Sequence, residues 1–388
     1  MSDPTRIAVL HVGKFYPPAP GGMERVVQLL CEGEQATTDS RVLVANTGFG
    51  TIRERWRGVH VTRASSIGAI GSVGVCPTFP LELARAGRDL TVIHEPNPLA
   101  LVSDWVTARK GPLVVWFHSE VIRPRWKYRL LYRPFLRRVL RRASRIVVSS
   151  PALAEHAEEL QDFRDKCVVI PFGIDIARLA RTPAVDAEIA KISKTYSGPR
   201  ALFVGRLVPY KGVDYLVRAM ASVDATALIV GDGPQRRELE ALAAEVGSAG
   251  RVHFLGHLTD DEVVAHLHAC DILVLPSVTR AETFGVVQLE AMACGKPVLS
   301  TNLPTGVPWV NRGGETGLVV EPADVPALAA ALASLTQDAG LRHRLGEAAR
   351  VRAVEHFSTE RMTAESASLY REVLMGKAAV SQPVATSA

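Results

Sequence analysis

The chain has 388 residues, 47% of them apolar, and carries a formal net charge of +5. A chain of this length is longer than an ordinary domain with a single hydrophobic core, so two domains are expected. The five cysteines are scattered without a Cys-x-x-Cys pair, which argues against a zinc site or a disulfide framework and favours a reducing compartment. The sequence lacks a signal peptide and any apolar run of membrane-spanning length, so we expect a cytoplasmic protein.

Short apolar runs alternate with helical patterns along the chain. Strands are expected at 6–12, 90–94, 113–117, 145–149 and 168–170, and again at 201–204, 225–230, 251–255, 271–275 and 297–300. Helices are expected at 23–34, 98–109, 134–143 and 151–160, and then at 211–221, 235–246, 260–269 and 284–294. This alternation implies parallel sheets covered on both faces.

The pattern restarts after a connection at about 172–198 that mixes polar, charged, proline and glycine residues. We therefore predict an α/β protein of two doubly wound domains, 1–175 and 176–358. A further helix is expected at 359–374, and 376–388 is expected to be a flexible tail. Ligands of doubly wound sheets bind outside the carboxyl ends of the strands, so functional residues should lie in the strand-to-helix loops.

The first such loop of the second domain contains two cations. Arg206 and Lys211 follow the expected strand 201–204 and stand five residues apart. An arginine can hold phosphate oxygens with its planar fork while a lysine adds a point charge, and together they can stabilise a departing diphosphate. The alternative interpretation is a solvated pair at the start of a helix.

Two glutamates, Glu282 and Glu290, flank the expected start of the helix at 284–294. If this helix begins near Phe284, its free amides can bind phosphate, and the two carboxylates can face one side of the helix. Carboxylates suit the paired hydroxyls of a sugar or a ribose. The alternative is that both glutamates are ordinary acidic residues on the helix surface, but the apolar neighbours of Glu290 argue against it.

In the first domain, the loop after strand 6–12 contains Gly21 and Gly22, which open a helix and let backbone approach a ligand closely. Neither domain has a Gly-x-Gly-x-x-Gly motif after a strand, which disfavours a dinucleotide-dependent oxidoreductase. His118 and His94 each stand at the carboxyl end of an expected strand and are candidates for the site. The alternative for Gly21 and Gly22 is a tight turn that binds no ligand. The alternative for His94 and His118 is that both are packed residues without a role in the site.

The positive charge is concentrated between Arg123 and Arg145, where ten basic residues occur without an acidic one. From Pro134 onward, apolar side chains form one stripe and arginines occupy the other faces. Such a helix can rest on an anionic membrane, where each basic residue contributes about 1 kcal/mol. It can equally pack on its own sheet with a solvated arginine face. Nucleic-acid binding is disfavoured, because the segment belongs to no recognised nucleic-acid-binding module.

An ordered series of motifs runs through the second domain. The series is Gly205-Arg206-x4-Lys211-Gly212, Gly231-Asp232-Gly233-Pro234, Phe254-Leu255-Gly256, Leu275-Pro276-Ser277, and Glu282-x7-Glu290 followed by 291–298. In content, order and spacing it resembles the family 4 glycosyltransferases. The resemblance implies the GT-B fold, in which two Rossmann-like domains face each other across a cleft and the helix 359–375 crosses back to the first domain.

The resemblance also implies roles for individual residues. Arg206 and Lys211 would hold the diphosphate, Glu282 the donor-sugar hydroxyls, Glu290 the ribose, and His118 the donor sugar and the reacting region. The remaining donor-binding positions implied by the resemblance are Gly21, Gly22, Thr283, Phe284, Gly285, Val286, Gly256 and His257. The sequence departs from the family at Trp309, where relatives often carry glutamate, so the acceptor-side role of that loop stays open.

The function implied is retaining transfer of a hexose from a nucleoside-diphosphate sugar, with GDP-mannose as the first candidate, to a glycan or a lipid-linked glycan. Asp-x-Asp is absent, so no metal and no other cofactor is expected. Membrane contact would run through the basic segment Arg123–Arg145. The alternatives are another GT-B enzyme, such as a nucleotide-sugar epimerase or a phosphorylase, and a catalytically silent homologue that serves as a binding subunit.

Overall fold

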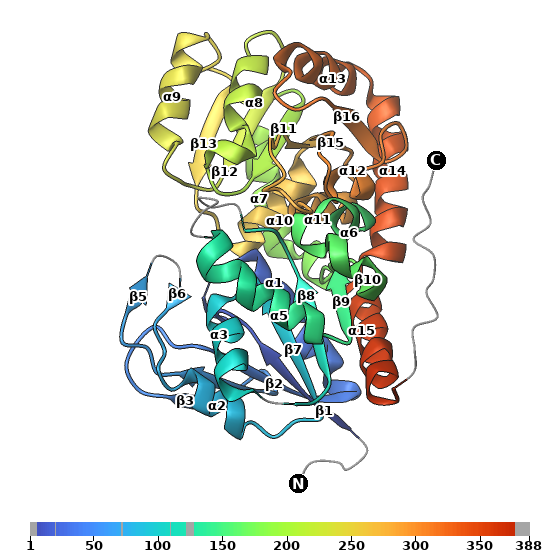
Figure 1. Cartoon of the computed structure of the whole chain (residues 1–388). Helices are drawn as coiled ribbons and strands as arrows, with labels where there is room; N and C mark the ends of the chain where they lie inside the picture. Colours follow the sequence, from blue (N-terminus) through green and yellow to red (C-terminus); the bar gives the residue numbers. More distant parts are fainter. Residues whose placement is uncertain (1–5, 20, 71–72, 109, 122–127, 377–388) are drawn as a thin grey trace. The chain divides into compact units, whose positions relative to one another are not determined.

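A computed structural model of the chain describes residues 6–19, 21–70, 73–108, 110–121 and 128–376 (Figure 1). The chain divides into two compact units. The first unit runs to Gly173 and resumes at Thr359, and the second is Ile174–Ser358. The break follows Gly173, against an expected boundary after residue 175. Residues 377–388, most of the expected tail, lie outside the described part.

The first unit is built on an eight-stranded sheet of order β10-β9-β8-β7-β1-β2-β4-β3, in which β3 alone pairs antiparallel. Its strands are β1 (Ile7–Val12), β2 (Thr38–Ala45), β3 (Ile52–Trp56), β4 (Val59–Ala64), β7 (Leu90–Glu95), β8 (Leu113–Phe117), β9 (Arg145–Val148) and β10 (Cys167–Val169). A separate small ribbon pairs β5 (Ala69–Ile70) with β6 (Val73–Gly74). The order of the sheet reverses at β1, which lies between β2 and β7.

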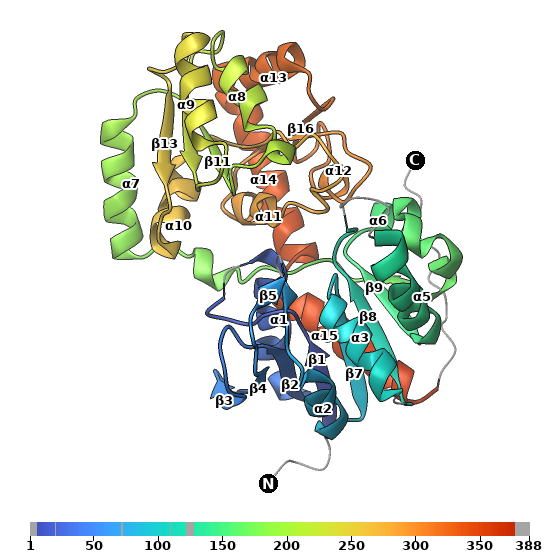
Figure 2. The ribbon, with the colours of Figure 1, turned by 60° about the vertical axis from the view of Figure 1, so that its left-hand side comes forward.

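Helices cover both faces of this sheet (Figure 2). They are α1 (Gly22–Gly33), α2 (Phe79–Arg85), α3 (Pro98–Thr107), α5 (Arg133–Arg142), α6 (Pro151–His156) and α15 (Thr359–Leu374), with the 3-10 segments η1 (Glu34–Ala36) and η3 (Glu158–Lys166) and the π-helical segment η2 (Tyr128–Tyr132). Alternate residues of β2 show the two faces. Leu43 belongs to the apolar cluster with α2, α3 and α5, whereas Val42 and Val44 belong to the cluster with Val27 and Cys31 of α1.

The second unit is a six-stranded, wholly parallel sheet of order β13-β12-β11-β14-β15-β16. The strands are β11 (Arg200–Val204), β12 (Thr226–Val230), β13 (Val252–Gly256), β14 (Ile272–Leu275), β15 (Val298–Thr301) and β16 (Gly317–Val320). The helices are α7 (Pro183–Thr195), α8 (Val213–Ala219), α9 (Arg236–Glu245), α10 (Asp260–Ala269), α11 (Val286–Ala293), α12 (Val307–Val310), α13 (Val325–Gln337) and α14 (Ala339–His356), with turns η4 (Ala177–Leu179) and η5 (Pro209–Lys211).

Two parallel-sheet α/β units confirm the predicted fold class. Elements β2 to β6, β16, α2, α12, α13 and α14 were not predicted from the sequence. The segment expected to be a connection forms α7, a 13-residue helix packed against α10. Within the described part of the chain, no helix combines the length and the apolar character needed to cross a membrane.

Candidate active site

The second unit reverses its strand order between β11 and β14, and the loops that leave their carboxyl ends therefore line the position where doubly wound sheets bind ligands. After β11 come Arg206 and Lys211, and after β14 come Ser277 and Glu282. The loops touch, because the Val278 N–H donates to the carbonyl of Tyr210 at 2.9 Å. The structure thus brings together the two predicted motifs that flank this edge.

Glycine lets the loops after β11, β12 and β13 approach each other. Gly231 has φ 119°, and a side chain there would begin 2.0 Å from the carbonyl oxygen of Gly205. Gly231 also donates its N–H to the carbonyl of Gly256 at 2.8 Å. Only glycine fits this backbone conformation and this space. The predicted donor residue Gly256 therefore lies beside the β11 and β12 loops, and His257, which follows it, is exposed.

Lys211 and Glu282 form a largely buried ion pair. The Lys211 ammonium lies 2.5 Å from the Glu282 carboxylate, with side chains 13% and 9% exposed, and the Ser277 hydroxyl donates to the same carboxylate oxygen at 3.0 Å. Burial acts to lower the pKa of the Lys211 ammonium, but Glu282 and Tyr210 outweigh it and leave the pKa raised. The lysine therefore stays charged at the carboxyl edge of the sheet.

Helix α11 begins at Val286, two residues after the expected start near Phe284. Gly285 caps the helix in the left-handed region, at φ 69°, and a Cβ there would lie 2.5 Å from the Leu275 side chain. Phe284 is 1% exposed, and its ring packs on Trp309 and on Phe357. Trp309, the departure from the family pattern, thus belongs to an aromatic cluster that anchors the loop. The backbone of Thr283, by contrast, accepts the Gly306 N–H at 2.8 Å.

The remaining predicted residues of the second unit differ in their surroundings. Arg206 is exposed and makes no side-chain hydrogen bond or ion pair with the described residues. Glu290 is half-buried and lies 3.5 Å from Arg178, which also pairs with Asp260. Arg206 is thus available to an anionic ligand, whereas Glu290 already faces a cation.

In the first unit, His94 and His118 lie at the carboxyl ends of the adjacent strands β7 and β8 and contact each other. The His94 Nδ1 is 2.9 Å from the His118 Nε2, and both rings are buried. Burial lowers the pKa of His118 to about 3 and that of His94 well below its ordinary value, with the neighbouring histidines adding to the effect at His94. Both residues are neutral imidazoles at physiological pH.

The loop with Gly21 and Gly22 opens α1, as predicted from the sequence. The carboxylate of Glu24 folds back over Gly21: a Cβ on Gly21 would begin 2.0 Å from a Glu24 oxygen. Glu24 is 8% exposed, and burial raises its pKa despite the Glu24 backbone amide and Lys14. A carboxylate thus covers the start of α1 in this structure.

Several buried polar groups lie near these histidines, and His11 and Tyr132 among them were not predicted as site residues. His11 lies within the apolar run of β1, Glu95 ends β7, and Tyr132 hydrogen-bonds the Glu95 carboxyl. Burial raises the pKa of Glu95 to about 8, against the lowering effect of Tyr132 and the Asn97 amide. A polar residue inside an otherwise apolar strand was the signal that could have identified His11.

The apolar stripe of the basic helix is buried within its own unit. Leu136, Val139 and Leu140 of α5 are at most 1% exposed and belong to the main core, and Arg142 pairs with Asp104. This stripe cannot lie on a membrane while it fills the core. Arg123, Arg125 and Lys127 lie outside the described residues.

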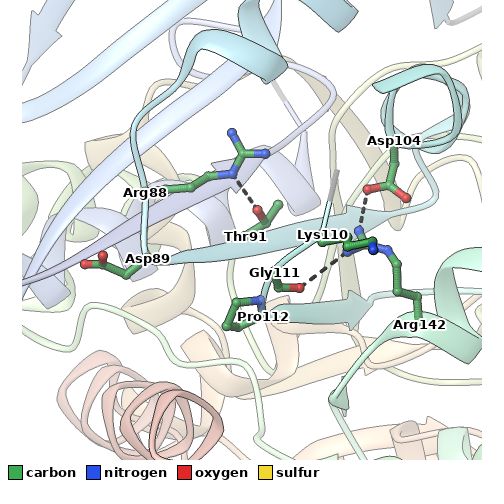
Figure 3. A pocket seen from close by; sticks show the side chains of 8 residues that line it. All are labelled: Arg88, Asp89, Thr91, Asp104, Lys110, Gly111, Pro112 and Arg142. Atoms are coloured by element: carbon green, nitrogen blue, oxygen red, sulfur yellow. Dashed lines mark hydrogen bonds and ion pairs between the residues drawn. The ribbon is translucent and has the colours of Figure 1, made fainter. Parts of the chain in front are cut away.

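A cavity of about 130 Å³ lies at the opposite edge of the first sheet (Figure 3). It is lined by Arg88, Asp89, Thr91, Asp104, Lys110, Gly111, Pro112 and Arg142. Asp89 precedes β7 and Pro112 precedes β8, so the cavity adjoins the amino ends of these strands. The Arg142–Asp104 ion pair and the bond from Arg88 to Thr91 already occupy much of its polar lining. It is therefore separate from the carboxyl edge where the predicted residues lie.

Comparison with known proteins identifies the family. A family model described as "Glycosyltransferase Family 4" matches residues 20–178, and one described as "Glycosyl transferases group 1" matches residues 185–352. The chain is 34% identical over 353 residues to the D-rhamnosyltransferase WbpZ of Pseudomonas aeruginosa, which covers 89% of this chain and 90% of that protein. The chain belongs to the family 4 glycosyltransferases of GT-B fold.

Other relatives act within the same class of chemistry. The O-antigen chain mannosyltransferase C of Escherichia coli is 28% identical over 95% of this chain and 99% of its own length. A GDP-mannose-dependent alpha-(1-6)-phosphatidylinositol monomannoside mannosyltransferase of Mycobacterium tuberculosis is 36% identical over 52% of this chain and 55% of its own. Among solved structures, sucrose-phosphate synthase (tll1590) from Thermosynechococcus elongatus superposes with TM-score 0.77 at 23% identity, covering 96% of this chain and 100% of that one.

Proposed function

We propose that this glycosyltransferase moves a hexose, with retained anomeric configuration, from a nucleoside-diphosphate sugar to a glycan or lipid-linked glycan acceptor in surface polysaccharide or glycolipid synthesis. The observation that carries the proposal is the buried Lys211–Glu282 pair at the carboxyl edge between β11 and β14. A charged ammonium held there can meet a diphosphate, and a carboxylate beside it can accept hydroxyl protons of the sugar.

GDP-mannose is the first donor to test. A rhamnosyltransferase and two mannosyltransferases are among the relatives, and one of the mannosyltransferases is named as GDP-mannose-dependent. The O-antigen relative supports a glycan acceptor for this chain.

In the proposed reaction the bond between the anomeric carbon and the diphosphate oxygen breaks, and a bond to the acceptor oxygen forms on the same face of the sugar. The acceptor's proton passes to the departing diphosphate. Lys211, Arg206 and the N-terminus of α11 would stabilise the charge that develops there, a role that fixed cations and helix amides perform without a metal.

Thermal denaturation with GDP, UDP, ADP and dTDP and their sugars tests the donor site, because a ligand that binds only the folded state raises the melting temperature. Arg206→Met is the informative variant, since Arg206 is exposed and no side-chain partner among the described residues depends on it. It should reduce the nucleotide-induced shift without changing the stability of the free protein. Arg218→Met is the matched control, because Arg218 is an exposed arginine in the last turn of α8, which runs away from the carboxyl edge.

The outcomes separate the alternatives. Donor turnover that needs no acceptor would indicate an epimerase-like or phosphorylase-like enzyme. The absence of any shift with any nucleotide would refute the donor site and favour a binding subunit. An equal effect of Arg206→Met and Arg218→Met would refute the assignment of Arg206.

Contact with an anionic membrane is a further part of the proposal, through side chains other than the buried stripe of α5. Leu130 and Leu131 of η2 are 68% and 70% exposed. Trp105 of α3, whose ring packs on Phe135 of α5, is 51% exposed. Arg138 and Arg141 of α5, the helix that follows η2 in the chain, are exposed as well. Apolar side chains with basic neighbours suit a surface of anionic lipid.

Cosedimentation with vesicles tests this contact. Binding to vesicles with anionic lipid should exceed binding to phosphatidylcholine vesicles, fall with salt, and weaken in Leu130→Ser/Leu131→Ser. The control is Val351→Ser in the second unit, where the side chain is 47% exposed. Equal binding by both variants would contradict the proposed surface.

A further inference from the structure

Three buried histidines form a continuous chain across adjacent strands of the first unit. The His11 Nδ1 lies 3.1 Å from the His94 Nε2, and the His94 Nδ1 lies 2.9 Å from the His118 Nε2. His11 and His94 are completely buried, and His118 is 5% exposed. None of the family motifs in the sequence accounts for His11 or for this connection.

The sheet register produces the chain. His11 of β1 pairs with Val92, two residues before His94, and His94 of β7 pairs with Trp116, two residues before His118. Residues two apart on a strand share a face, so the three imidazoles lie on one face of the sheet, each one step nearer its carboxyl edge. Figure 2 shows β1, β7 and β8 side by side.

Glu34 stands at the far end of this chain. Its carboxylate lies 3.4 Å from the His11 Nε2, and both side chains are fully buried. The contact lacks the alignment of a hydrogen bond, so the carboxylate acts on His11 chiefly through its charge. A negative oxygen at this distance favours a proton, rather than a lone pair, on the facing nitrogen. The Ser40 hydroxyl donates to the same oxygen at 3.3 Å and helps to hold it in place.

The direction of the chain follows from the hydrogen-bonding capacity of a neutral imidazole, which has one donor nitrogen and one acceptor nitrogen. If His11 carries its proton on Nε2, its Nδ1 accepts from the His94 Nε2, and the His94 Nδ1 in turn accepts from the His118 Nε2. The His118 Nδ1 is then a bare acceptor. This atom is buried and has no hydrogen-bond partner among the described residues, which is costly unless a ligand supplies the donor.

We propose that Glu34 is a positioning residue that, through His11 and His94, fixes His118 in the tautomer with the proton on Nε2, so that Nδ1 can accept a hydrogen bond from a hydroxyl group of the substrate. The part played by that acceptor in transfer rests on the proposed function. The tautomer itself does not, because it is a property of the free protein.

Nitrogen NMR of protein labelled with ¹⁵N-histidine tests the tautomer directly, since protonated and unprotonated ring nitrogens resonate far apart. The His118 signals are assigned by their loss in His118→Asn. We expect a protonated Nε2 and an unprotonated Nδ1 in the wild type. In Glu34→Met the charge that sets the direction is gone, and a population with a protonated His118 Nδ1 should appear.

The matched control is Glu32→Met, because the Glu32 carboxylate accepts from Gln28 and pairs with Arg57 rather than with a histidine. His11→Leu interrupts the chain at another position and should also allow a population of His118 with the proton on Nδ1. This variant keeps the test available if Glu34→Met does not fold. A protonated Nδ1 in the wild type, which would mean that the chain of hydrogen bonds runs in the reverse direction, would overturn the proposal. So would an unchanged His118 tautomer in both folded variants.

Kinetics separate this role from the proposed function. Loss of one hydrogen bond to the substrate should lower kcat/KM in Glu34→Met by about tenfold, whereas Glu32→Met should retain wild-type values. If the wild type transfers no sugar, the proposed function fails while the tautomer result stands. If transfer is normal and the tautomer is released without loss of rate, the hydroxyl contact at Nδ1 is refuted.

Discussion

The Lys211–Glu282 pair makes a quantitative prediction about how variants of the donor site must be interpreted. In Lys211→Met the Glu282 carboxylate, 9% exposed, keeps the Ser277 hydroxyl as its one partner among the described residues. Removing one member of a buried ion pair costs about 3–5 kcal/mol, because the remaining charge is buried and uncompensated. For a domain of 150–250 residues, this corresponds to a fall in melting temperature of about 6–20 °C. A loss of activity in this variant would therefore mix lost chemistry with lost stability.

The double variant Lys211→Met/Glu282→Gln separates the two effects. It removes both charges, and replacing both members of a buried pair is often nearly neutral for stability, so its melting temperature should return close to that of the wild type. Nucleotide-induced stabilisation should nevertheless be absent in the double variant. The assay is differential scanning fluorimetry with and without nucleotide, supported by denaturant unfolding. A single variant as stable as the wild type would refute the buried pair, and a nucleotide shift retained in the double variant would refute its role in binding.

Three other predictions concern stability. The pKa of Glu95 is raised from its ordinary 4.5 to about 8 in the folded chain, so the unfolded chain loses this proton first as pH rises. The free energy of unfolding therefore falls between about pH 4.5 and 8, by up to about 5 kcal/mol. Glu95→Gln should therefore gain stability over the wild type across that window in denaturant titrations, and parallel pH profiles would contradict this. Gly231→Ala should unfold at markedly lower denaturant concentration, since its Cβ would begin 2.0 Å from the Gly205 carbonyl oxygen, whereas Gly250→Ala, with open space around it, should not. Asn311→Ala should cost about 2–4 kcal/mol, because the buried amide donates to the Val298 and Leu318 carbonyls and to the Ser300 hydroxyl; a change below about 1 kcal/mol in chemical denaturation would count against this bridge.

The sequence by itself determined the class of fold. Strand β8 and helices α10 and α15 were located to the residue. Most other boundaries of the predicted elements were located to within two residues, because parallel strands are short apolar runs and helices repeat every 3.6 residues. It also placed Arg206, Lys211, Ser277 and Glu282 at the ends of β11 and β14. Strand β3 escaped detection because it is an exposed edge strand with polar residues and lacks the apolar run of a central strand. Strand β2 does contain a buried apolar run, at residues 42–45, which the prediction overlooked.

Only the tertiary structure decided which of these groups meet. Sequence spacing cannot show that Lys211 and Glu282, 71 residues apart, neutralise each other, or that the stripe of α5 fills the core instead of facing a membrane. It cannot show that Glu34 and His11 connect to His118 either, because the connection depends on the order β1-β7-β8 and on a register that places the histidines on one face. Burial and hydrogen bonding are properties of neighbours in space, and it is those neighbours that set the charge of Lys211 and Glu95 and the proton position of His118.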